Sequence, residues 1–166
     1  TALIHLAAMT DASGSVHKKD ELFANNLGGT ETVIKLCIKQ GIKLVFPSST
    51  SVYGSQVSLV DENTLNLNPQ SPYADCKLKE EDFILDLCKK NNLNAVIFRF
   101  GTIFGVSNGM RFHTAVNKFC WQAAMGQPIT VWRTAYDQKR PYLDLLDAAR
   151  AFSFIIKNDI FDGRIY

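Results

Sequence analysis

A tyrosine and a lysine stand four residues apart at the start of a predicted helix. Ser71 and Pro72 offer an N-cap and a first-turn proline, and Tyr73 and Lys77 follow on the same helical face. A free tyrosine, with a pKa of about 10, is a weak base at neutral pH, but an adjacent ammonium favours the phenolate. The pair is therefore predicted to act as an acid/base that removes a proton from a hydroxyl group.

A hydroxyl-rich segment lies upstream of this pair. Ser48 to Ser51 follow the apolar run Leu44-Val45-Phe46, at the carboxyl end of a predicted strand, where open α/β sheets bind ligands. A hydroxyl at Ser49 could bridge a substrate and Tyr73 in a proton relay. The alternative is that these hydroxyls only end a strand and begin a turn.

Short apolar runs alternate with helical patterns through the first two thirds of the chain. The predicted strands cover Leu3 to Ala8, Leu44 to Phe46 and Ala95 to Phe98. Between them, helices are predicted at about Asp20 to Gln40, ended by Gly41, and at Pro72 to Asn91, with a loop from Thr10 to Lys19 before the first. This alternation predicts an α/β fold with a parallel sheet and right-handed crossovers.

The pattern changes beyond Gly101. A helix is predicted over Val116 to Met125, a short strand over Ile129 to Trp132, and a helix from about Asp147 to Lys157. These elements indicate part of a small C-terminal substrate-binding subdomain added to the sheet. We therefore predict two regions, residues 1–105 and residues 106–166.

Composition excludes several function classes. A formal charge of +2 without a basic stripe argues against a nucleic-acid partner, and no apolar run approaches the roughly 20 residues that span a bilayer. The four cysteines form no CxxC pair and have no histidine at metal-ligand spacing, so we predict reduced thiols and no metal site. With no signal-peptide pattern at the N-terminus, the expected compartment is the cytoplasm.

Several motifs occur in an order that resembles a known family. The chain contains LIHLAA at residues 3–8, NNLGGT at 25–30, SSTSVYG at 48–54 and SPY at 71–73 with Lys77; RFGTIFG at 99–105 and RPYLD at 140–144 follow. Together they resemble extended short-chain dehydrogenases/reductases, the NAD-dependent epimerase/dehydratase family, over essentially the whole chain. The resemblance implies a Rossmann-like, doubly wound parallel sheet.

The resemblance also implies roles for the residues above. Tyr73 would be the catalytic acid/base, Lys77 would bind the nicotinamide ribose and lower the pKa of the tyrosine, and Ser49 would relay the proton. The cofactor would be NAD, with NADP as the alternative. Further residues expected near the cofactor are Leu6, Ala7, Ala8 and Asn25.

A second set of residues is implied for a nucleotide-sugar substrate. Arg140 matches a diphosphate-binding arginine, a role that suits the two-pronged donor geometry of a guanidinium. The other expected substrate residues are Ser49, Thr50, Ser51, Gly101, Thr102, Thr130, Val131 and Trp132. Taken without the resemblance, Arg140 is equally well a solvated surface arginine.

Two departures from the family pattern qualify this expectation. The glycine-rich turn that receives a dinucleotide pyrophosphate is not found in the chain, so we expect a fragment that lacks the first strands of its sheet. Thr50 and Ser51 stand where sugar dehydratases of the family use an Asp-Glu pair, which disfavours dehydration.

The expected function is an NAD-dependent nucleotide-sugar epimerase, an activity expected of the full-length protein and not necessarily of this fragment. One alternative is an NAD(P)-dependent sugar or carbonyl reductase that uses the same residues. Another is a non-catalytic dinucleotide-sensing or scaffold protein. By analogy with the family we expect a homodimer formed through the two predicted helices at about 20–40 and 72–91.

Overall fold

The chain folds into two units, each built from parallel strands and helices. The computed structural model describes residues 1–10, 17–55, 59–90 and 92–166. The first unit contains Thr1–Arg99 and Phe154–Tyr166, and the second contains Phe100–Ser153. The bounds of these units differ from the predicted regions 1–105 and 106–166, since residues 154–166 belong to the first unit, and the predicted division stays a prediction. The predicted α/β class is confirmed.

A three-stranded sheet forms the centre of the first unit. Its strands are β1 (Ala2–Ile4), β2 (Lys43–Ser49) and β3 (Ala95–Phe100), in the order β1-β2-β3. β1 pairs parallel with β2, with Leu3 opposite Leu44. The prediction of a strand continuing to Ala8 is wrong, because the chain leaves the sheet once the His5 N–H has bonded to the Val45 carbonyl at 3.0 Å.

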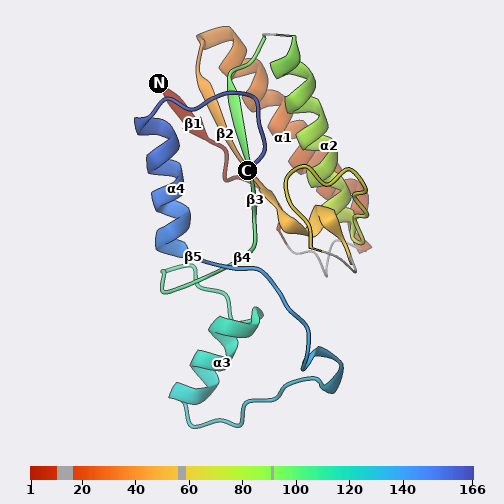
Figure 1. The fold of residues 1–166 in the computed structure, drawn as a ribbon, viewed down its shortest axis with the longest axis vertical. Helices are drawn as coiled ribbons and strands as arrows, with labels where there is room; N and C mark the ends of the chain where they lie inside the picture. The colour runs from red at the N-terminus through yellow and green to blue at the C-terminus, as the bar shows by residue number, and fades with distance from the viewer. Residues whose placement is uncertain (11–16, 56–58, 91) are drawn as a thin grey trace. The chain divides into compact units, whose positions relative to one another are not determined.

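Two helices pack side by side within this unit (Figure 1). They are α1 (Lys19–Gln40) and α2 (Pro72–Lys89), and each contacts β2. Both helices end or begin as the sequence predicts. Gly41 ends α1 in the left-handed conformation, and the Ser71 hydroxyl accepts a hydrogen bond from the Ala74 N–H at the start of α2. Their apolar faces meet the sheet in a core that includes Ile34, Phe46, Ile84 and Ile97.

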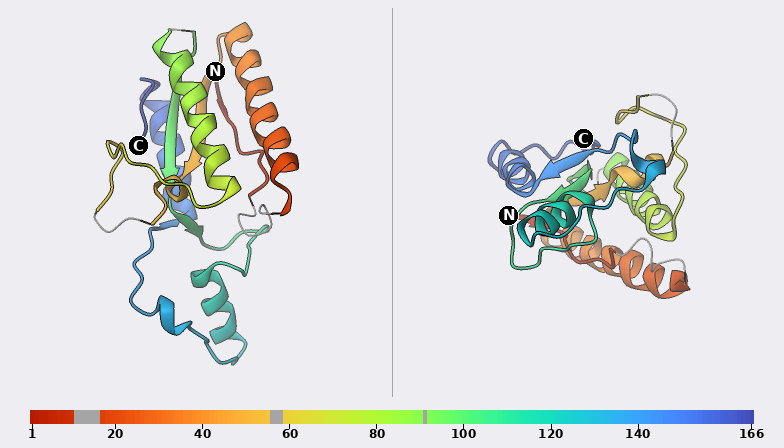
Figure 2. Two further views of the ribbon diagram at one scale, coloured as in Figure 1. Left: turned by 90° about the vertical axis from the view of Figure 1, so that its right-hand side faces the viewer. Right: turned by 90° about the horizontal axis from the view of Figure 1, so that it is seen from below.

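The second unit contains a small sheet and a helix. Strand β4 (Thr102–Phe104) pairs parallel with β5 (Tyr142–Asp144), and α3 (Ala115–Ala124) lies between them in the chain. Figure 2 gives two further views of these elements, and α4 (Leu145–Lys157) follows β5 directly. The strand predicted over Ile129 to Trp132 is wrong. This segment is exposed and unpaired with any strand, and it leads into a 3-10 turn, η3 (Arg133–Ala135).

No helix in the described parts of the chain combines the length and apolar character needed to span a bilayer. The predicted loop from Thr10 to Lys19 lies largely outside the described residues.

A buried histidine connects the end of β1 to α1. His5 Nε2 lies 3.1 Å from the Thr30 hydroxyl, and that hydroxyl donates its only proton to Glu80 Oε1 of α2. Thr30 must therefore accept from His5, so the histidine carries its proton on Nε2. Burial, followed by the positive charge of Lys77, lowers the pKa of His5, while Glu80 opposes them.

The turn between β2 and the following loop requires a glycine. After β2 comes the 3-10 helix η2 (Thr50–Tyr53), and Gly54 ends it at φ 65° and ψ −151°. A Cβ at Gly54 would lie 1.8 Å from the backbone oxygen of Asn68, whereas a Cβ at Gly41, also at positive φ, would meet nothing within 4 Å. A side chain at Gly41 therefore meets backbone strain alone, whereas one at Gly54 meets a more strained backbone conformation and a steric clash.

We expect Gly54→Ala to destabilise the protein far more than Gly41→Ala. The Gly41 variant should lose about 1 kcal/mol, the usual cost of a left-handed alanine. The Gly54 variant adds a clash with a backbone atom, which no side-chain rotation relieves. Urea unfolding of both variants measures the difference, and equal losses would show that the Asn68 contact carries no cost.

We expect His5 to make the fold sensitive to mild acid. Since folding lowers the pKa of His5, the unfolded chain takes up the proton more readily, and stability present above the ordinary pKa of 6.5 is lost as the pH falls. Replacement by glutamine, which cannot titrate, should reduce the loss of unfolding free energy between about pH 7.5 and about pH 5.5. His113→Gln, at an exposed site, is the matched control and should retain the wild-type slope.

Candidate active site

The first turns of α2 present the two residues that the sequence singles out for acid/base chemistry. Tyr73 is half-buried and Lys77 is buried, one helical turn later on the same face. α2 also contacts η2, which begins immediately after Ser49. The structure therefore brings the elements that carry Ser49, Tyr73 and Lys77 into contact. No hydrogen bond joins Ser49 to Tyr73 directly.

The hydroxyl cluster is ordered around Ser49. Its Oγ accepts hydrogen bonds from the backbone N–H of Ser51 at 3.2 Å and from the Ser51 hydroxyl at 2.9 Å. Ser49 thus ends β2 and caps η2, as the turn interpretation of this segment predicted. Its own hydroxyl proton is not committed to either contact and can be donated. Ser49 can therefore cap η2 and still donate its proton in the expected relay.

Lys77 is held by groups from the fold. Its Nζ lies 3.1 Å from Oε2 of Glu80, with both side chains at most 5% exposed, and 4.4 Å from the centre of the Phe46 ring. Phe46 belongs to β2, so the ammonium lies between the helix and the sheet. A carboxylate and an aromatic face both stabilise a buried cation.

The ionisation of Tyr73 differs from the expectation. Burial, followed by the negative charge of Glu80, raises the pKa of Tyr73 to about 12, with Cys76 acting in the same direction. The expected lowering of the Tyr73 pKa by Lys77 is not seen in this structure, because burial and the negative charge of Glu80 act in the opposite direction. Tyr73 is therefore a neutral phenol at physiological pH in this arrangement.

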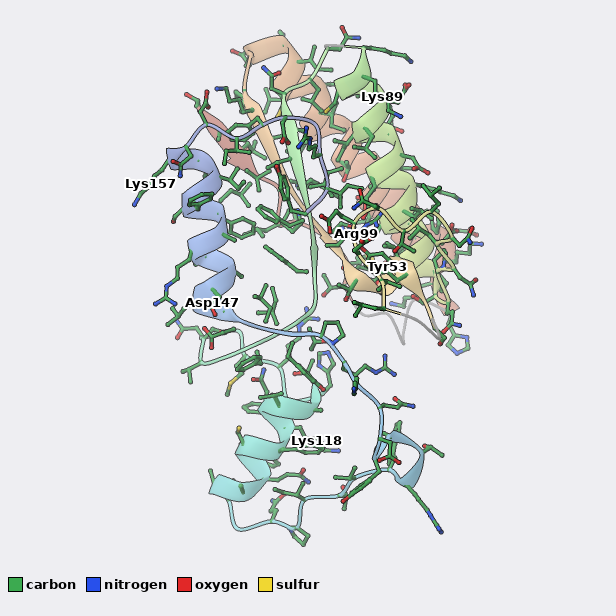
Figure 3. All side chains as sticks on the ribbon, viewed as in Figure 1. Tyr53, Lys89, Arg99, Lys118, Asp147 and Lys157 are labelled. Atoms are coloured by element: carbon green, nitrogen blue, oxygen red, sulfur yellow. The ribbon has the colours of Figure 1, made fainter. Side chains whose placement is uncertain are left out.

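A second buried carboxylate follows on the same helix and has quite different partners. Glu81 receives hydrogen bonds from Arg99 Nε at 3.2 and 3.1 Å and from Arg99 Nη2 at 2.7 Å, and it also accepts from the Ser48 hydroxyl. The Arg99 guanidinium lies 4.9 Å from the centre of the Tyr53 ring. Both residues are labelled in Figure 3. Glu81 thus connects α2 to β2 and β3, and Arg99 in turn contacts Tyr53 of η2.

The residues expected to line a cofactor lie just after β1. Leu6 and Ala7 are exposed and Ala8 is half-buried, so this stretch presents small side chains and open backbone. Asn25 is exposed, and its amide donates to the side chain of Asn26 at 2.9 Å. Asn26, which sequence reasoning passed over, is the asparagine that faces this segment. It accepts from the Met9 N–H at 2.7 Å and donates to the Met9 carbonyl at 3.0 Å.

Several expected substrate residues belong to the second unit, where β4 and β5 bring two of the motifs together. The Thr102 N–H donates to the Pro141 carbonyl at 3.0 Å, and a Cβ on Gly101 would lie 2.7 Å from that carbonyl oxygen. Arg140, next in the chain, is exposed and donates to Gln138 Oε1 at 3.1 Å. Thr130, Val131 and Trp132 are exposed, with Trp132 at 81%.

The sequence signal for Glu80 and Glu81 was weak. Both lie in the charged run Lys79-Glu80-Glu81-Asp82, which is more typical of a solvated helix face. Only their helical register distinguishes them, since positions three and four residues after Lys77 return to its face of the helix. Among the described residues, no group of three or more histidine, cysteine or acidic side chains is arranged to hold a metal ion.

Known proteins similar to this chain share both sequence and fold. UDP-glucose 4-epimerase of Azospirillum brasilense is 29% identical over 164 residues, covering 90% of this chain and 47% of that protein. The human UDP-glucose 4-epimerase is 35% identical over 102 residues, covering 60% of this chain and 29% of that protein. The chain therefore spans about half or less of the length of the curated relatives it matches.

Solved structures agree with these relatives. UDP-glucuronic acid 4-epimerase of Bacillus cereus, in complex with UDP-glucuronic acid and NAD, has a TM-score of 0.83 and 25% identity, over 98% of this chain and 52% of that chain. A UDP-N-acetylglucosamine 4-epimerase of Methanobrevibacter ruminantium has a TM-score of 0.80 and 25% identity, over 89% of this chain and 48% of that chain. The family model described as the NAD dependent epimerase/dehydratase family matches residues 1–166. The ordered motifs, the parallel α/β fold and this match over the whole chain establish that the protein belongs to the NAD dependent epimerase/dehydratase family.

Proposed function

We propose that the full-length protein is an NAD-dependent nucleotide-sugar epimerase. The observation that carries the proposal is the placement of Tyr73 and Lys77 on one face of α2, against the turn that follows Ser49. The relatives support it, because the Bacillus cereus enzyme is described as a UDP-sugar 4-epimerase in complex with NAD. This chain spans part of such a protein, so the activity is assigned to the whole.

The residues present fit one part of an NAD molecule, the nicotinamide ribose. The small side chains after β1 leave the backbone open to approach, and Lys77 offers an ammonium that a ribose hydroxyl can accept from. The fit requires Lys77 to turn from Glu80, its present partner at 3.1 Å. When bound, NAD supplies the acceptor for a hydride from the sugar carbon. NADP stays the alternative cofactor.

The proposed reaction assigns one step to each of the three residues. Tyr73 as the phenolate removes the proton of the sugar hydroxyl, through the Ser49 hydroxyl or directly. Lys77 stabilises the developing phenolate charge, because an adjacent cation favours the anionic form. When the keto sugar is reduced from its opposite face, Tyr73 returns the proton. The second unit is proposed to hold the nucleotide, with Arg140 on the diphosphate and Thr130, Val131 and Trp132 near the base.

A reductase is the second candidate, favoured by one observation. The pKa of Tyr73, raised to about 12, makes it a neutral phenol, the form that donates a proton to a substrate carbonyl. A one-way carbonyl reductase needs this form at the start of its reaction, whereas an epimerase first needs the phenolate. A non-catalytic scaffold needs neither form.

We further propose a cytoplasmic homodimer that forms through α1 and α2. An exposed apolar side chain on α1 supports this assembly, because Leu36 is 46% exposed. Burying such a side chain against a second copy suits a symmetric dimer. Sedimentation of Leu36→Lys tests the interface, since the variant should sediment as a monomer if α1 forms the contact. A dimer mass equal to that of the wild-type protein would rule out this interface.

Tyr73→Phe in the full-length protein should abolish epimerisation while nucleotide-sugar binding remains. The substitution removes only the hydroxyl that carries the proton, so a fall in kcat of at least about 10²-fold is expected. NMR of the sugar anomeric proton follows turnover, and calorimetry follows binding. Tyr166→Phe, which removes an exposed hydroxyl bonded to Asp162, is the matched control and should retain activity. Full activity in Tyr73→Phe would eliminate the proposed base.

Net cofactor consumption separates the two enzymatic candidates. An epimerase returns the hydride to the sugar and leaves the NAD pool unchanged, whereas a reductase oxidises one reduced cofactor for each product formed. We expect no net change in absorbance at the reduced nicotinamide band while the sugar equilibrates. Stoichiometric loss of NADH or NADPH would instead establish the reductase.

A further inference from the structure

Two buried carboxylates stand next to each other on α2, and their surroundings differ. Glu81 is satisfied by Arg99 and Ser48, and it connects separate elements of the fold. Glu80 is equally buried, at 1% exposure; Thr30 donates to its Oε1, and its Oε2 lies 3.1 Å from the Lys77 ammonium. Glu81 therefore connects α2 to the sheet, whereas Glu80 is joined to α1 through Thr30 and also holds the Lys77 ammonium.

The Glu80–Lys77 pair is a poor source of stability. Both residues lie on one helix at i and i+3, so their attraction joins no separate elements. Taking two charges out of water often costs more than their mutual attraction regains, even at the 3.1 Å between Lys77 Nζ and Glu80 Oε2. The pair therefore calls for a reason other than folding.

Lys77 and Glu80 are the charged groups that face one another in this buried cluster. From the segment after β1 comes His5, whose pKa is lowered by burial; from α1 comes the neutral hydroxyl of Thr30; and from β2 comes the Phe46 ring. On α2 itself, burial and then Glu80 raise the pKa of Cys76 to about 11, so it is a neutral thiol. Glu80 therefore competes with Tyr73, and with any bound ligand, for the positive charge of Lys77.

We propose that Glu80 is a positioning residue for the proposed reaction, which holds the Lys77 ammonium in a buried ion pair and so limits its action on Tyr73. Thr30 fixes the Glu80 carboxylate from α1 by donating to Oε1, and His5 fixes Thr30. A ligand hydroxyl that draws Lys77 away from Glu80 leaves the ammonium free to stabilise the Tyr73 phenolate. Binding of the ligand then makes Tyr73 a better base. This inference rests on the proposed function and deepens it.

Glu80→Gln in the full-length protein tests the proposal. The amide keeps the shape and can still accept from Thr30, but it removes the negative charge that opposes the Tyr73 phenolate. The pKa of Tyr73 should fall by about one pH unit, which gives roughly tenfold more phenolate at a fixed pH. NMR of ring-labelled tyrosine measures this pKa, with the Tyr73 signal identified by its loss in Tyr73→Phe. The acidic limb of the kcat–pH profile should move the same way.

Asp75→Asn is the matched control. It removes a carboxylate from the same helix, nearer to Tyr73 in the chain, but Asp75 is partly exposed and pairs with Lys79 at 3.4 Å. Solvent screens such a charge, so the pKa of Tyr73 should move by less than about 0.3 unit. A shift of equal size in both variants would mean that net charge on the helix, and not the Glu80 contact, sets the ionisation of Tyr73.

The remaining outcomes separate this inference from the proposed function. An unchanged or higher Tyr73 pKa in Glu80→Gln overturns the inference, whether or not the protein epimerises sugars. A protein that proves inactive but shows the fall in pKa retains the inference and loses the function. If Glu80→Gln does not fold, Glu80→Asp keeps the charge but draws it back from Lys77. It should lower the Tyr73 pKa by a smaller amount, and no fall in that variant overturns the proposal.

Discussion

The buried pair between Glu81 and Arg99 is the interaction on which the geometry of the site depends. Arg99 approaches the carboxylate through two nitrogen atoms, and Ser48 completes its bonding from β2. Removing one partner of such a pair typically costs about 3–5 kcal/mol, because the other charge is left buried and alone. This cost exceeds the contribution of any surface ion pair on α2, such as Lys90 with Asp86. The Glu81–Arg99 pair therefore fixes the separation between α2 and the turn at Ser49, because breaking it is energetically costly.

The sequence predicted most of the first unit because its signals are local. Gly41, Ser71 and Pro72 mark helix ends through their own backbone chemistry, and the apolar runs of β2 and β3 are continuous because both strands are buried. The errors arise where a strand depends on a partner. The run at Leu3 to Ala8 and the segment at Ile129 to Trp132 have strand-like composition. Pairing, which composition does not report, ends the first at Ile4 and is absent from the second.

The candidate site was predictable in its principal residues and not in its electrostatics. Tyr73 and Lys77 are identified by their spacing, but the ionisation of the tyrosine depends on Glu80, whose burial cannot be read from a run of charges. The same limit explains Asn25 and Asn26. Adjacent asparagines on a helix point about 100° apart, and only the packing of α1 against the chain after β1 decides which one faces it.

The contact between Asn26 and Met9 resembles one rung of a β-ladder made by a side chain. A single amide satisfies both the donor and the acceptor of one backbone residue, as a neighbouring strand does. The chain after β1 can therefore remain fixed while its other face stays free of sheet neighbours. Because Asn26 belongs to α1, this stretch is attached to a helix of 22 residues. A ligand that binds to the stretch would therefore contact a segment that the helix holds in place.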